Sequence, residues 1–353
     1  STTQVYDVRT VEAANGADDD IQGDSGRDRL FGGQGSDTID GGADSDVIFG
    51  DHGHMGYRSP DYFSTSDIDL FTLDVVESID TAAVLGMADV ITDELADDII
   101  FGGQGNDSID SGGGQNLVFG DHGRILGVDN TVALLANRPI GDPITSKTDD
   151  DYPVKVLGLV TSIDAGAING TGNEFGNGDD TITTGIDRDM IFGGGGDDTV
   201  NTYAGSGGTA ALDGNNIVFG DHGLVDYLAE EIAQGGPAHN PLRTLDIDRV
   251  WSIDTAMGGA DDITAGDRHD IVVGGMAGDV INAGHGKNIV FGDAGQATAA
   301  TQDDPLVQIS VHEFTVGEVV SIAFADGGAD RIHTGDHDDI LLGGRGADQL
   351  DTG

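Results

Sequence analysis

The sequence predicts an all-β fold in which the chain winds into a parallel β-coil. A nine-residue pattern, G-G-x-G-x-D-x-U-x with U a large aliphatic residue, recurs in register, and its cores begin at Gly32, Gly102, Gly193, Gly274 and Gly343. Each nine divides into a six-residue turn and a three-residue strand, because glycine adopts the positive φ angles that residues with a Cβ resist. Two nines make one turn of a flattened right-handed coil.

The aliphatic position supports this fold most strongly. It points to one side of its strand while its two neighbours point to the other, so stacked coils align it as a continuous core. All nineteen residues at this position are Ile, Leu or Val: Ile21, Leu30, Ile39, Ile48, Ile91, Ile100, Ile109, Val118, Ile182, Ile191, Val200, Val218, Ile263, Val272, Ile281, Val290, Ile332, Leu341 and Leu350.

The sixth position of each nine carries an acid or its amide: Asp19, Asp28, Asp37, Asp46, Asp89, Asp98, Asp107, Asn116, Asp180, Asp189, Asp198, Asn216, Asp261, Asp270, Asp279, Asn288, Asp330, Asp339 and Asp348. Stacked strands lie about 4.8 Å apart, so these carboxylates stand side by side along each edge. Two bare charges at that separation repel by roughly 3 kcal/mol at an effective dielectric of about 20, so the ladder needs cations. Carboxylate and carbonyl oxygens suit a hard ion, and Ca²⁺ tolerates variable geometry better than Mg²⁺.

The nine-residue pattern resembles the calcium-binding repeat of the repeats-in-toxin (RTX) family, over roughly half of the chain. The resemblance implies a parallel β-roll with calcium between successive turns on each edge, ordered only with calcium, in proteins usually exported by a type I secretion system. Asn116, Asn216 and Asn288 depart from the aspartate pattern, so we expect weaker or differently shaped sites there. By position, the implied ligands are the sixth-position residues and the turn carbonyls of Gly33, Gly35, Gly103, Gly105, Gly194, Gly196, Gly275, Gly344 and Gly346.

Pairing the sixth positions eighteen residues apart within units predicts about nine or more calcium ions, with dissociation constants of ~10⁻⁴–10⁻³ M. The pairs are 19 with 37, 28 with 46, 89 with 107, 98 with 116, 180 with 198, 198 with 216, 261 with 279, 270 with 288, and 330 with 348.

The composition excludes several functional classes. The chain has 64 acidic and 15 basic residues, a net charge of −49 and 59 glycines. A chain this acidic is either disordered or neutralised by cations, and the aliphatic ladder argues against disorder. It has no clustered basic residues for nucleic acid or anionic membranes, no apolar stretch near the roughly 20 residues of a membrane span, and no cysteine. These features fit an extracellular protein.

Five units follow one plan and are expected to form one continuous rod: residues 1–58, 59–127, 128–226, 227–298 and an incomplete unit 299–353. A strand-like segment opens each unit, at Val5–Val11, Leu73–Thr81, Val156–Asp164, Leu245–Thr255 and Glu318–Phe324. A terminator closes the first four units, GDHG at Gly50, Gly120 and Gly220 and GDAG at Gly292. Variable insertions are expected at about Met55–Ile68, Arg124–Lys155, Leu224–Arg243 and Gln296–Leu306, and Thr202–Ala210 is expected to bulge. Because Ser1 opens on a strand-like stretch and Gly353 ends inside a unit, we expect a piece of a longer array.

Alternate nines differ in the residues that flank the aliphatic position. One series is polar and the other apolar, and seven of the twelve phenylalanines stand in the apolar row. A sheet that is apolar on both sides is normally covered on both sides. Two explanations remain open: the segments Asp67–Thr81, Val154–Asp164, Leu242–Thr255 and Val307–Phe324 form a second layer of strands, or a partner molecule covers the row and builds a filament. Both predict that Phe49, Phe119, Phe219 and Phe291 are buried.

The chain shows no H-E-x-x-H and no nucleophile-elbow motif, so we predict that it is not an enzyme. The terminator histidines His52, His122 and His222 could ligate a transition metal, but Ala294 in the fourth copy favours a capping or turn role.

We predict a calcium-binding structural module of a secreted bacterial repeat protein, of the fibre, adhesin or surface-layer type, which self-assembles or binds cell-surface components. The alternative is a calcium-dependent secretion and folding tail of a larger exported enzyme or toxin. Flanking sequence would separate the two: more units indicate a fibre or adhesin, and a protease or lipase motif indicates a tail.

Overall fold

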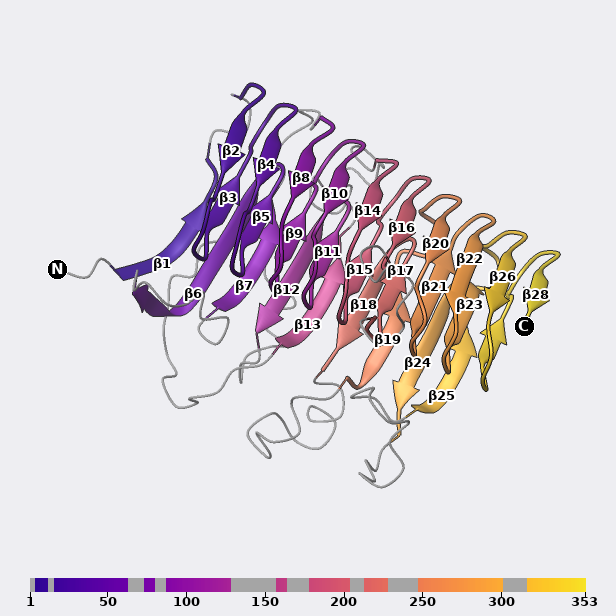
Figure 1. The fold of residues 1–353 in the computed structure, drawn as a ribbon. Coiled ribbons are helices and arrows are strands. Elements are labelled where there is room, and N and C mark those ends of the chain that lie inside the picture. Colours follow the sequence, from indigo (N-terminus) through magenta and orange to yellow (C-terminus); the bar gives the residue numbers. More distant parts are fainter. Residues whose placement is uncertain are drawn as a thin grey trace.

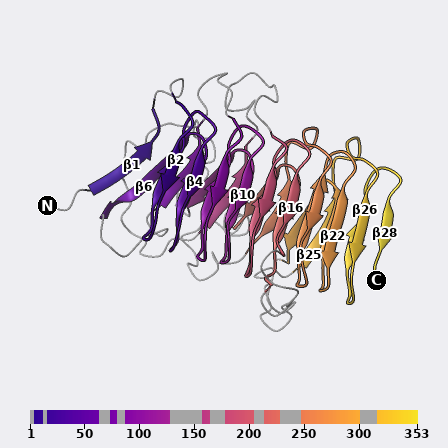
Figure 2. The ribbon, with the colours of Figure 1, turned by 45° about the horizontal axis from the view of Figure 1, so that its top comes forward.

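The computed structural model describes residues 4–11, 16–62, 73–79, 87–127, 157–163, 178–203, 213–227, 247–300 and 316–353, and every helix or strand in these ranges is a β-strand. Figure 1 shows an elongated stack of turns with the two ends of the chain at opposite ends of the stack. Three sheets run along it, and the view in Figure 2 confirms that their strands follow one another from the N-terminal to the C-terminal end. Among the described residues no helix has the length and apolar character to cross a membrane.

The nine-residue repeats form two parallel sheets, as predicted. The first, here called the polar sheet, contains β2 (Asp20–Gln22), β4 (Thr38–Asp40), β8 (Val90–Thr92), β10 (Ser108–Asp110), β14 (Thr181–Thr183), β16 (Thr199–Asn201), β20 (Asp262–Thr264), β22 (Val280–Gly284), β26 (Arg331–Thr334) and β28 (Gln349–Asp351). The second, the apolar sheet, contains β3 (Arg29–Phe31), β5 (Val47–Phe49), β9 (Ile99–Phe101), β11 (Leu117–Phe119), β15 (Met190–Phe192), β17 (Ile217–Phe219), β21 (Ile271–Gly275), β23 (Ile289–Asp293) and β27 (Ile340–Leu342). The pairing stays in register across units, as Ile39 beside Ile91 shows.

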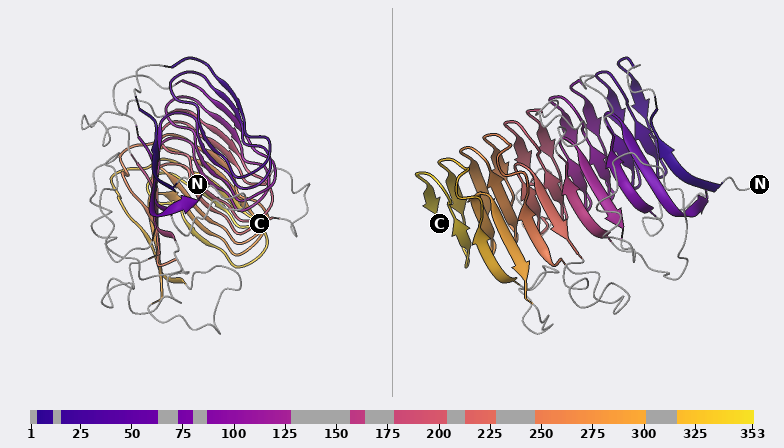
Figure 3. Two further views of the ribbon diagram at one scale, coloured as in Figure 1. Left: turned by 90° about the vertical axis from the view of Figure 1, so that its left-hand side faces the viewer. Right: turned by 180° about the vertical axis from the view of Figure 1, so that it is seen from behind.

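A third, antiparallel sheet, here called the cover sheet, lies over the apolar sheet (Figure 3). Its strands are β1 (Gln4–Arg9), β6 (Gly53–Tyr62), β7 (Leu73–Ser78), β12 (Gly123–Gly127), β13 (Leu157–Ser162), β18 (Gly223–Asp226), β19 (Arg249–Ser252), β24 (Gly295–Ala299) and β25 (Val316–Ser321). The strands that open the units (β1, β7, β13, β19 and β25) alternate with strands that follow the terminators (β6, β12, β18 and β24). Each unit boundary therefore adds a pair of antiparallel neighbours to this sheet.

Two hydrophobic layers separate the three sheets. The predicted aliphatic ladder fills the space between the polar and apolar sheets, where residues such as Ile39, Ile109 and Val218 are buried. The outward residues of the apolar sheet fill the second layer together with Met55, Val76 and their counterparts in the cover sheet. The inner strands of the apolar sheet, such as β5, β9 and β11, are thus buried on both faces, which explains why their three residues are all apolar. The end strands β3 and β27 are less buried, and β3 begins with Arg29.

Six phenylalanines form a continuous stack inside the second layer. The rings of Phe31, Phe49, Phe101, Phe119, Phe192 and Phe219 follow one another at centroid distances of 4.7–5.0 Å, with planes within 10° of parallel. This spacing is that of the strands themselves, because one residue of every strand lies in the same row.

The prediction of a second layer is confirmed. Phe49, Phe119, Phe219 and Phe291 are at most 1 % exposed, and strands of the same chain cover them. Parts of the predicted segments lie outside the described residues, namely 67–72, 80–81, 154–156, 164, 242–246 and 307–315.

The strands that follow the terminators lie in the predicted insertions, from which the second layer was expected, but outside the four segments that were named for it. Each begins at the last glycine of the terminator, where the chain leaves the apolar sheet. A Cβ at Gly53 would lie 2.4 Å from the ring of Phe49, and Gly123, Gly223 and Gly295 have the same relation to the phenylalanine four residues earlier. Only glycine lets the chain pass over the ring and enter the cover sheet. The first part of each predicted insertion is therefore a strand of the cover sheet, and residues 63–68, 128–155, 228–243 and 301–306 of the insertions lie outside the described residues.

The phenylalanine stack yields a stability prediction. Phe119→Ala should lower the free energy of unfolding by about 3–5 kcal/mol, because it removes a fully buried ring with a stacked neighbour on either side and leaves a cavity. Urea unfolding in saturating calcium measures the change. Phe324, which is 76 % exposed, is the matched control, and Phe324→Ala should change stability by no more than about 0.5 kcal/mol. Equal effects of the two substitutions would show that the stack contributes nothing.

Candidate metal-binding edges

The glycine turns between the strands have the conformation that the pattern predicts. Gly33 and Gly35 have φ angles of 104° and 147°, and the other seven glycines predicted as carbonyl ligands also have positive φ. In the fourth unit Ala277 stands at the fourth position of the nine, where Gly35 stands in the first unit, and it adopts a φ of 70°. The turns therefore keep one backbone shape even where the glycine is absent.

The sixth-position residues form one continuous ladder along each edge. On the first edge, which precedes the polar sheet, the backbone N–H of each residue donates a hydrogen bond of 2.7–3.2 Å to Oδ1 of the residue in the next turn. The chain of bonds links Asp19, Asp37, Asp89, Asp107, Asp180, Asp198, Asp261, Asp279, Asp330 and Asp348 in that order. Nine intervals between turns result, and they cross the unit boundaries without a break.

The second edge, which precedes the apolar sheet, has the same bonds at 2.7–3.1 Å. They link Asp28, Asp46, Asp98, Asn116, Asp189, Asn216, Asp270, Asn288 and Asp339, so this edge has eight intervals. The predicted pairing within units therefore extends across every boundary between units.

One predicted pair is wrong. Asn216 does not stand beside Asp198; its Oδ1 accepts the N–H of Asp189 at 2.9 Å, on the other edge. Asp198 is followed instead by Asp261. The extra nine residues in the third unit, Thr202–Ala210, of which 204–210 lie outside the described part, put Asn216 twenty-seven residues after its neighbour and return it to the second edge.

The second oxygen of most ladder carboxylates is buried and has no hydrogen-bond partner among the described residues. These Oδ2 atoms belong to Asp37, Asp89, Asp107, Asp180, Asp198, Asp261, Asp279 and Asp330 on the first edge and to Asp28, Asp46, Asp98, Asp270 and Asp339 on the second. A buried carboxylate oxygen without a donor is strongly unfavourable unless a cation or proton reaches it. This arrangement fits a row of oxygen-seeking cations between the turns, and no thiol is present to favour a softer metal.

Glycine at the first position of the nine makes room for this oxygen. A Cβ at Gly102 would lie 2.5 Å from Oδ2 of Asp107, and one at Gly193 would lie 2.5 Å from Oδ2 of Asp198. Where a larger residue takes this position on the second edge, it can satisfy the oxygen: the hydroxyl of Thr184 donates to Oδ2 of Asp189 at 2.6 Å. The first and sixth positions of one nine thus face each other.

The three asparagines keep the structural bond and lose the unpartnered oxygen. Their Oδ1 atoms accept backbone N–H groups as the aspartates do. Their Nδ2 groups donate to oxygens of the same edge: Asn216 to Ala265 O at 2.9 Å, Asn288 to Ala283 O at 3.3 Å and Asn116 to Gly114 O at 3.3 Å. The asparagine side chains are therefore hydrogen-bonded without a cation, and the weaker or differently shaped sites expected there stay a prediction.

Burial raises the pKa of many ladder carboxyl groups. It raises the pKa of Asp98 to about 6, of Asp89 to about 8 and of Asp279 to about 9, while neighbouring carboxylates add to the rise for Asp89 and Asp279. For Asp107 burial first, and then the nearby Asp180, raises the pKa well above its usual range. Without a cation the ladder therefore holds protons at pH values where isolated aspartates are ionised.

The terminator aspartates have a role that the sequence did not reveal. Asp121 is fully buried, and its two oxygens accept the N–H groups of Gly178 at 3.0 Å and Gly195 at 2.6 Å, both in the following unit. Asp221 and Asp293 accept equivalent pairs, and Asp51 accepts from Gln104. These carboxylates fasten one unit to the next. Their presence in GDHG and GDAG alike was the available signal, since the histidine changes and the aspartate does not.

The terminator histidines lie at the unit junctions. His122 is buried, and burial together with His222 lowers the pKa of His122 to about 4, so its imidazole is neutral. Among the described residues no histidine belongs to a group of three or more potential metal ligands within reach of one another; the one such group is Asp46, Asp93 and Asp98. His52, His122 and His222 lie outside this group, and their capping or turn role stays a prediction.

The raised pKa values predict an inverted pH dependence. Because the metal-free folded chain binds more protons than the unfolded chain between about pH 4 and about pH 9, its stability should be greatest near about pH 4 and fall as the pH rises through the raised pKa values. Calcium should reverse this order, since ligand carboxylates must be deprotonated. Thermal unfolding of resin-treated and calcium-saturated protein across this range measures both. A metal-free protein that gains stability from about pH 5 to about pH 8 would contradict the assignment.

Comparison with known protein families gives a match to a calcium-binding repeat. The model of the RTX calcium-binding nonapeptide repeat (4 copies) matches residues 14–53, 86–123, 176–207, 264–298 and 322–350. These ranges contain the sixth-position residues of both ladders except Asn216 and Asp261. No curated protein matches the chain. The repeat, its register and the parallel β-roll agree, and the chain belongs to the family of RTX calcium-binding repeat proteins.

Proposed function

We propose that this calcium-binding module is a folding-coupled rod of a secreted protein, in which calcium bound along both edges drives folding and stiffens the stack. The two carboxylate ladders are the observation that supports it. Each runs through all five units, and thirteen aspartates of the two ladders together hold a buried Oδ2 without a hydrogen-bond partner among the described residues. Such a structure is costly when its carboxyl groups ionise and becomes stable when divalent cations neutralise them.

The first edge is the principal calcium row of this proposal. All ten of its sixth-position residues are aspartates, so each of its nine intervals has a carboxylate from both turns. The glycine carbonyls of the turns, such as those of Gly33 and Gly35, would complete the oxygen shell. On the second edge, intervals with an asparagine have one carboxylate and would bind more weakly, because calcium affinity depends on ligand charge.

A mechanical or adhesive role fits the continuity of the three sheets. Both ladders, the phenylalanine stack and the cover sheet cross the unit boundaries, and the terminator aspartates fasten each unit to the next. A row of units joined in this way transmits force along its axis, which is what a fibre, adhesin or surface-layer component requires. Small-angle X-ray scattering with and without calcium tests the rod: a fixed maximum dimension should appear only with calcium, and equal dimensions in both states would argue against it.

Calcium-coupled folding is the central prediction. In excess EGTA at neutral pH the far-UV spectrum should lose its β signal, and the thermal midpoint should rise steeply with added calcium. Each site contributes about 2.7 kcal/mol when free calcium exceeds its dissociation constant a hundredfold. Magnesium at equal concentration is the control ion and should be much less effective. Unchanged β structure and thermal midpoint in EGTA would refute the proposal.

A single rung should act locally. Asp107→Ala removes an acceptor of the Asp89 N–H and one buried Oδ2, and should lower calcium occupancy and hydrogen-exchange protection in β8, β10 and β14 while β22 and β26 stay protected. Solenoid stability is largely a sum over neighbouring turns, which is why the effect stays near its origin. Asp110→Ala, an exposed carboxylate on the same strand, is the matched control. Loss of protection along the whole rod at saturating calcium would contradict the nearest-neighbour behaviour.

A further inference from the structure

Asp93 stands at a position that small residues occupy elsewhere on the second edge. It is the first residue of its nine, immediately after β8. The corresponding described positions hold Gly23, Gly41, Ser111, Thr184, Ala265, Ala283 and Thr334. A carboxylate at this place is therefore peculiar to the start of the second unit.

The first position of a nine is directed at the sixth residue of the same nine. Thr184 demonstrates this with its hydroxyl bond of 2.6 Å to Oδ2 of Asp189. A Cβ at Gly23 would likewise lie 3.1 Å from Oδ2 of Asp28. The backbone of the turn therefore lets a side chain at residue 93 reach the ladder, as Thr184 does, although Thr334 at the same position makes no bond to Oδ2 of Asp339.

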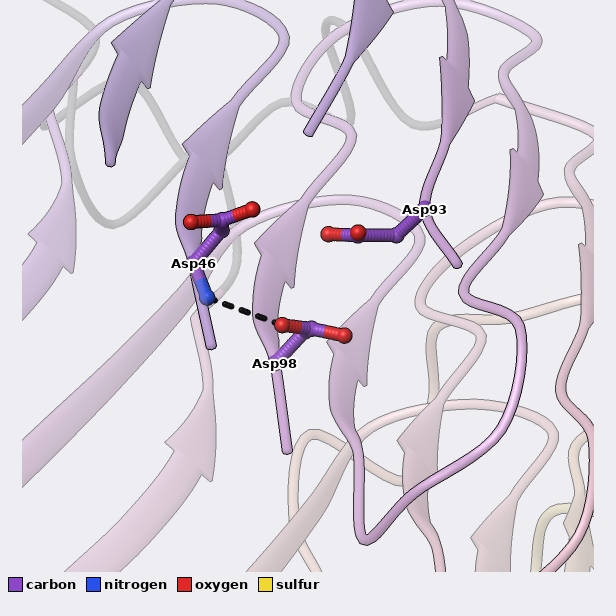
Figure 4. A group of neighbouring side chains, drawn as sticks. All are labelled: Asp46, Asp93 and Asp98. Atoms are coloured by element: carbon purple, nitrogen blue, oxygen red, sulfur yellow. Dashed lines mark hydrogen bonds between the residues drawn. The ribbon is translucent and has the colours of Figure 1, made fainter. Parts of the chain in front are cut away.

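Figure 4 shows the result: the carboxylates of Asp46, Asp93 and Asp98 converge between two turns. Each offers one oxygen, and the three oxygens lie within 4.8 Å of one another. Asp46 and Asp98 are 1 % exposed and Asp93 is 9 % exposed. A calcium ion with oxygens at about 2.3–2.6 Å can bridge ligands with this separation.

One oxygen of each carboxylate is already engaged by the backbone. Oδ1 of Asp46 accepts the N–H of Asp28, Oδ1 of Asp98 accepts that of Asp46, and Oδ1 of Asp93 accepts that of Glu94, at 2.7–2.9 Å. The three Oδ2 atoms are buried and have no hydrogen-bond partner among the described residues. Three held carboxylates thus present three unpartnered oxygens to one another.

Gly41 provides the space for this arrangement. A Cβ at residue 41 would lie 2.3 Å from Oδ2 of Asp93, so the carboxylate occupies the volume that a side chain in the preceding turn would fill. The pair of Gly41 and Asp93 is therefore specific to the boundary between the first and second units.

Counting the first- and sixth-position residues, the number of carboxylates along the second edge is highest at this boundary. The interval between Asp28 and Asp46 has two carboxylates, and every interval from Asp98 onward pairs one aspartate with one asparagine. With Asp93, the interval between Asp46 and Asp98 has three. Affinity for calcium increases with the number of ligand charges in a site.

We propose that Asp46, Asp93 and Asp98 form the tightest calcium site of the second edge, which fills before the others and fastens the first unit to the second. This rests on the proposed calcium-coupled folding. The ligands come from turns on either side of the boundary. Asp46 and Asp98, for example, are fifty-two residues apart in the sequence. Calcium binding here holds the last turn of the first unit against the first turn of the second unit. The following turns, whose asparagine-containing intervals bind calcium more weakly, can then stack on an ordered turn.

The test follows hydrogen exchange of the full-length chain during a calcium titration. In the wild type, the segments 46–49 and 98–101 should gain protection at a lower calcium concentration than 216–219 and 288–291. Asp93→Asn should raise the calcium midpoint of 98–101 by about tenfold or more, since one ligand charge is lost. Asp93→Gly, which restores the residue found at Gly23 and Gly41, should do the same.

Asp97→Asn is the matched control, because Asp97 is an exposed carboxylate of the same turn whose Oδ1 accepts the Gln115 N–H. It should leave the midpoint of 98–101 unchanged. The proposal is overturned if wild-type segments along the second edge share one midpoint, or if Asp93→Asn and Asp97→Asn behave alike. Absence of calcium-dependent protection in every segment would instead overturn calcium-coupled folding itself.

Discussion

The structure depends on one bond repeated at nearly every turn, from the backbone N–H of a sixth-position residue to the carboxylate of the next turn. This bond prevents the side chain from turning to solvent, so the same interaction that sets the register also buries the charge. Repulsion of roughly 3 kcal/mol between neighbours, summed over nine intervals, is on the order of 30 kcal/mol if all are ionised. That exceeds the ~5–15 kcal/mol by which proteins are normally stable. The backbone pattern itself thus creates the requirement for cations or protons.

The second hydrophobic layer enlarges the small core of the coil. A coil with a three-residue strand on each side buries one aliphatic residue per strand, which is a thin core. The phenylalanine row and the cover sheet add a second core, and the terminator links the two because its glycine passes over a phenylalanine ring while its aspartate binds the next unit. Each unit boundary is therefore a place where the chain changes sheets and where neighbouring units are fastened together.

The two edges differ in the number of carboxylates that they offer to a metal ion. The first edge is uniform, with an aspartate in every turn, whereas the second passes from a cluster of three carboxylates to alternating aspartate and asparagine. The Oδ1 of an asparagine accepts the same backbone N–H as that of an aspartate, and its Nδ2 donates to a nearby carbonyl. Its side chain therefore needs no calcium to satisfy its polar atoms, but it supplies no charge to a calcium site. In the proposed function the first edge is accordingly a row of similar sites, and the second is a graded row with the first unit boundary at its more strongly charged end.

The sequence by itself determined the nine-residue period, the aliphatic ladder, the acidic sixth position and the need to cover the apolar row, because each is a local pattern that repeats with the backbone. It did not reveal the strands after the terminators, whose residues carry no repeat, or the partners of Asp121, which belong to the next unit. It also misplaced Asn216, because an inserted loop changes which turns are neighbours without changing the motif. Asp93 reads as an ordinary turn residue until folding places it against Asp46, forty-seven residues earlier. Local periodicity specifies what each turn contains, and only the stacking of distant turns decides which side chains share a site.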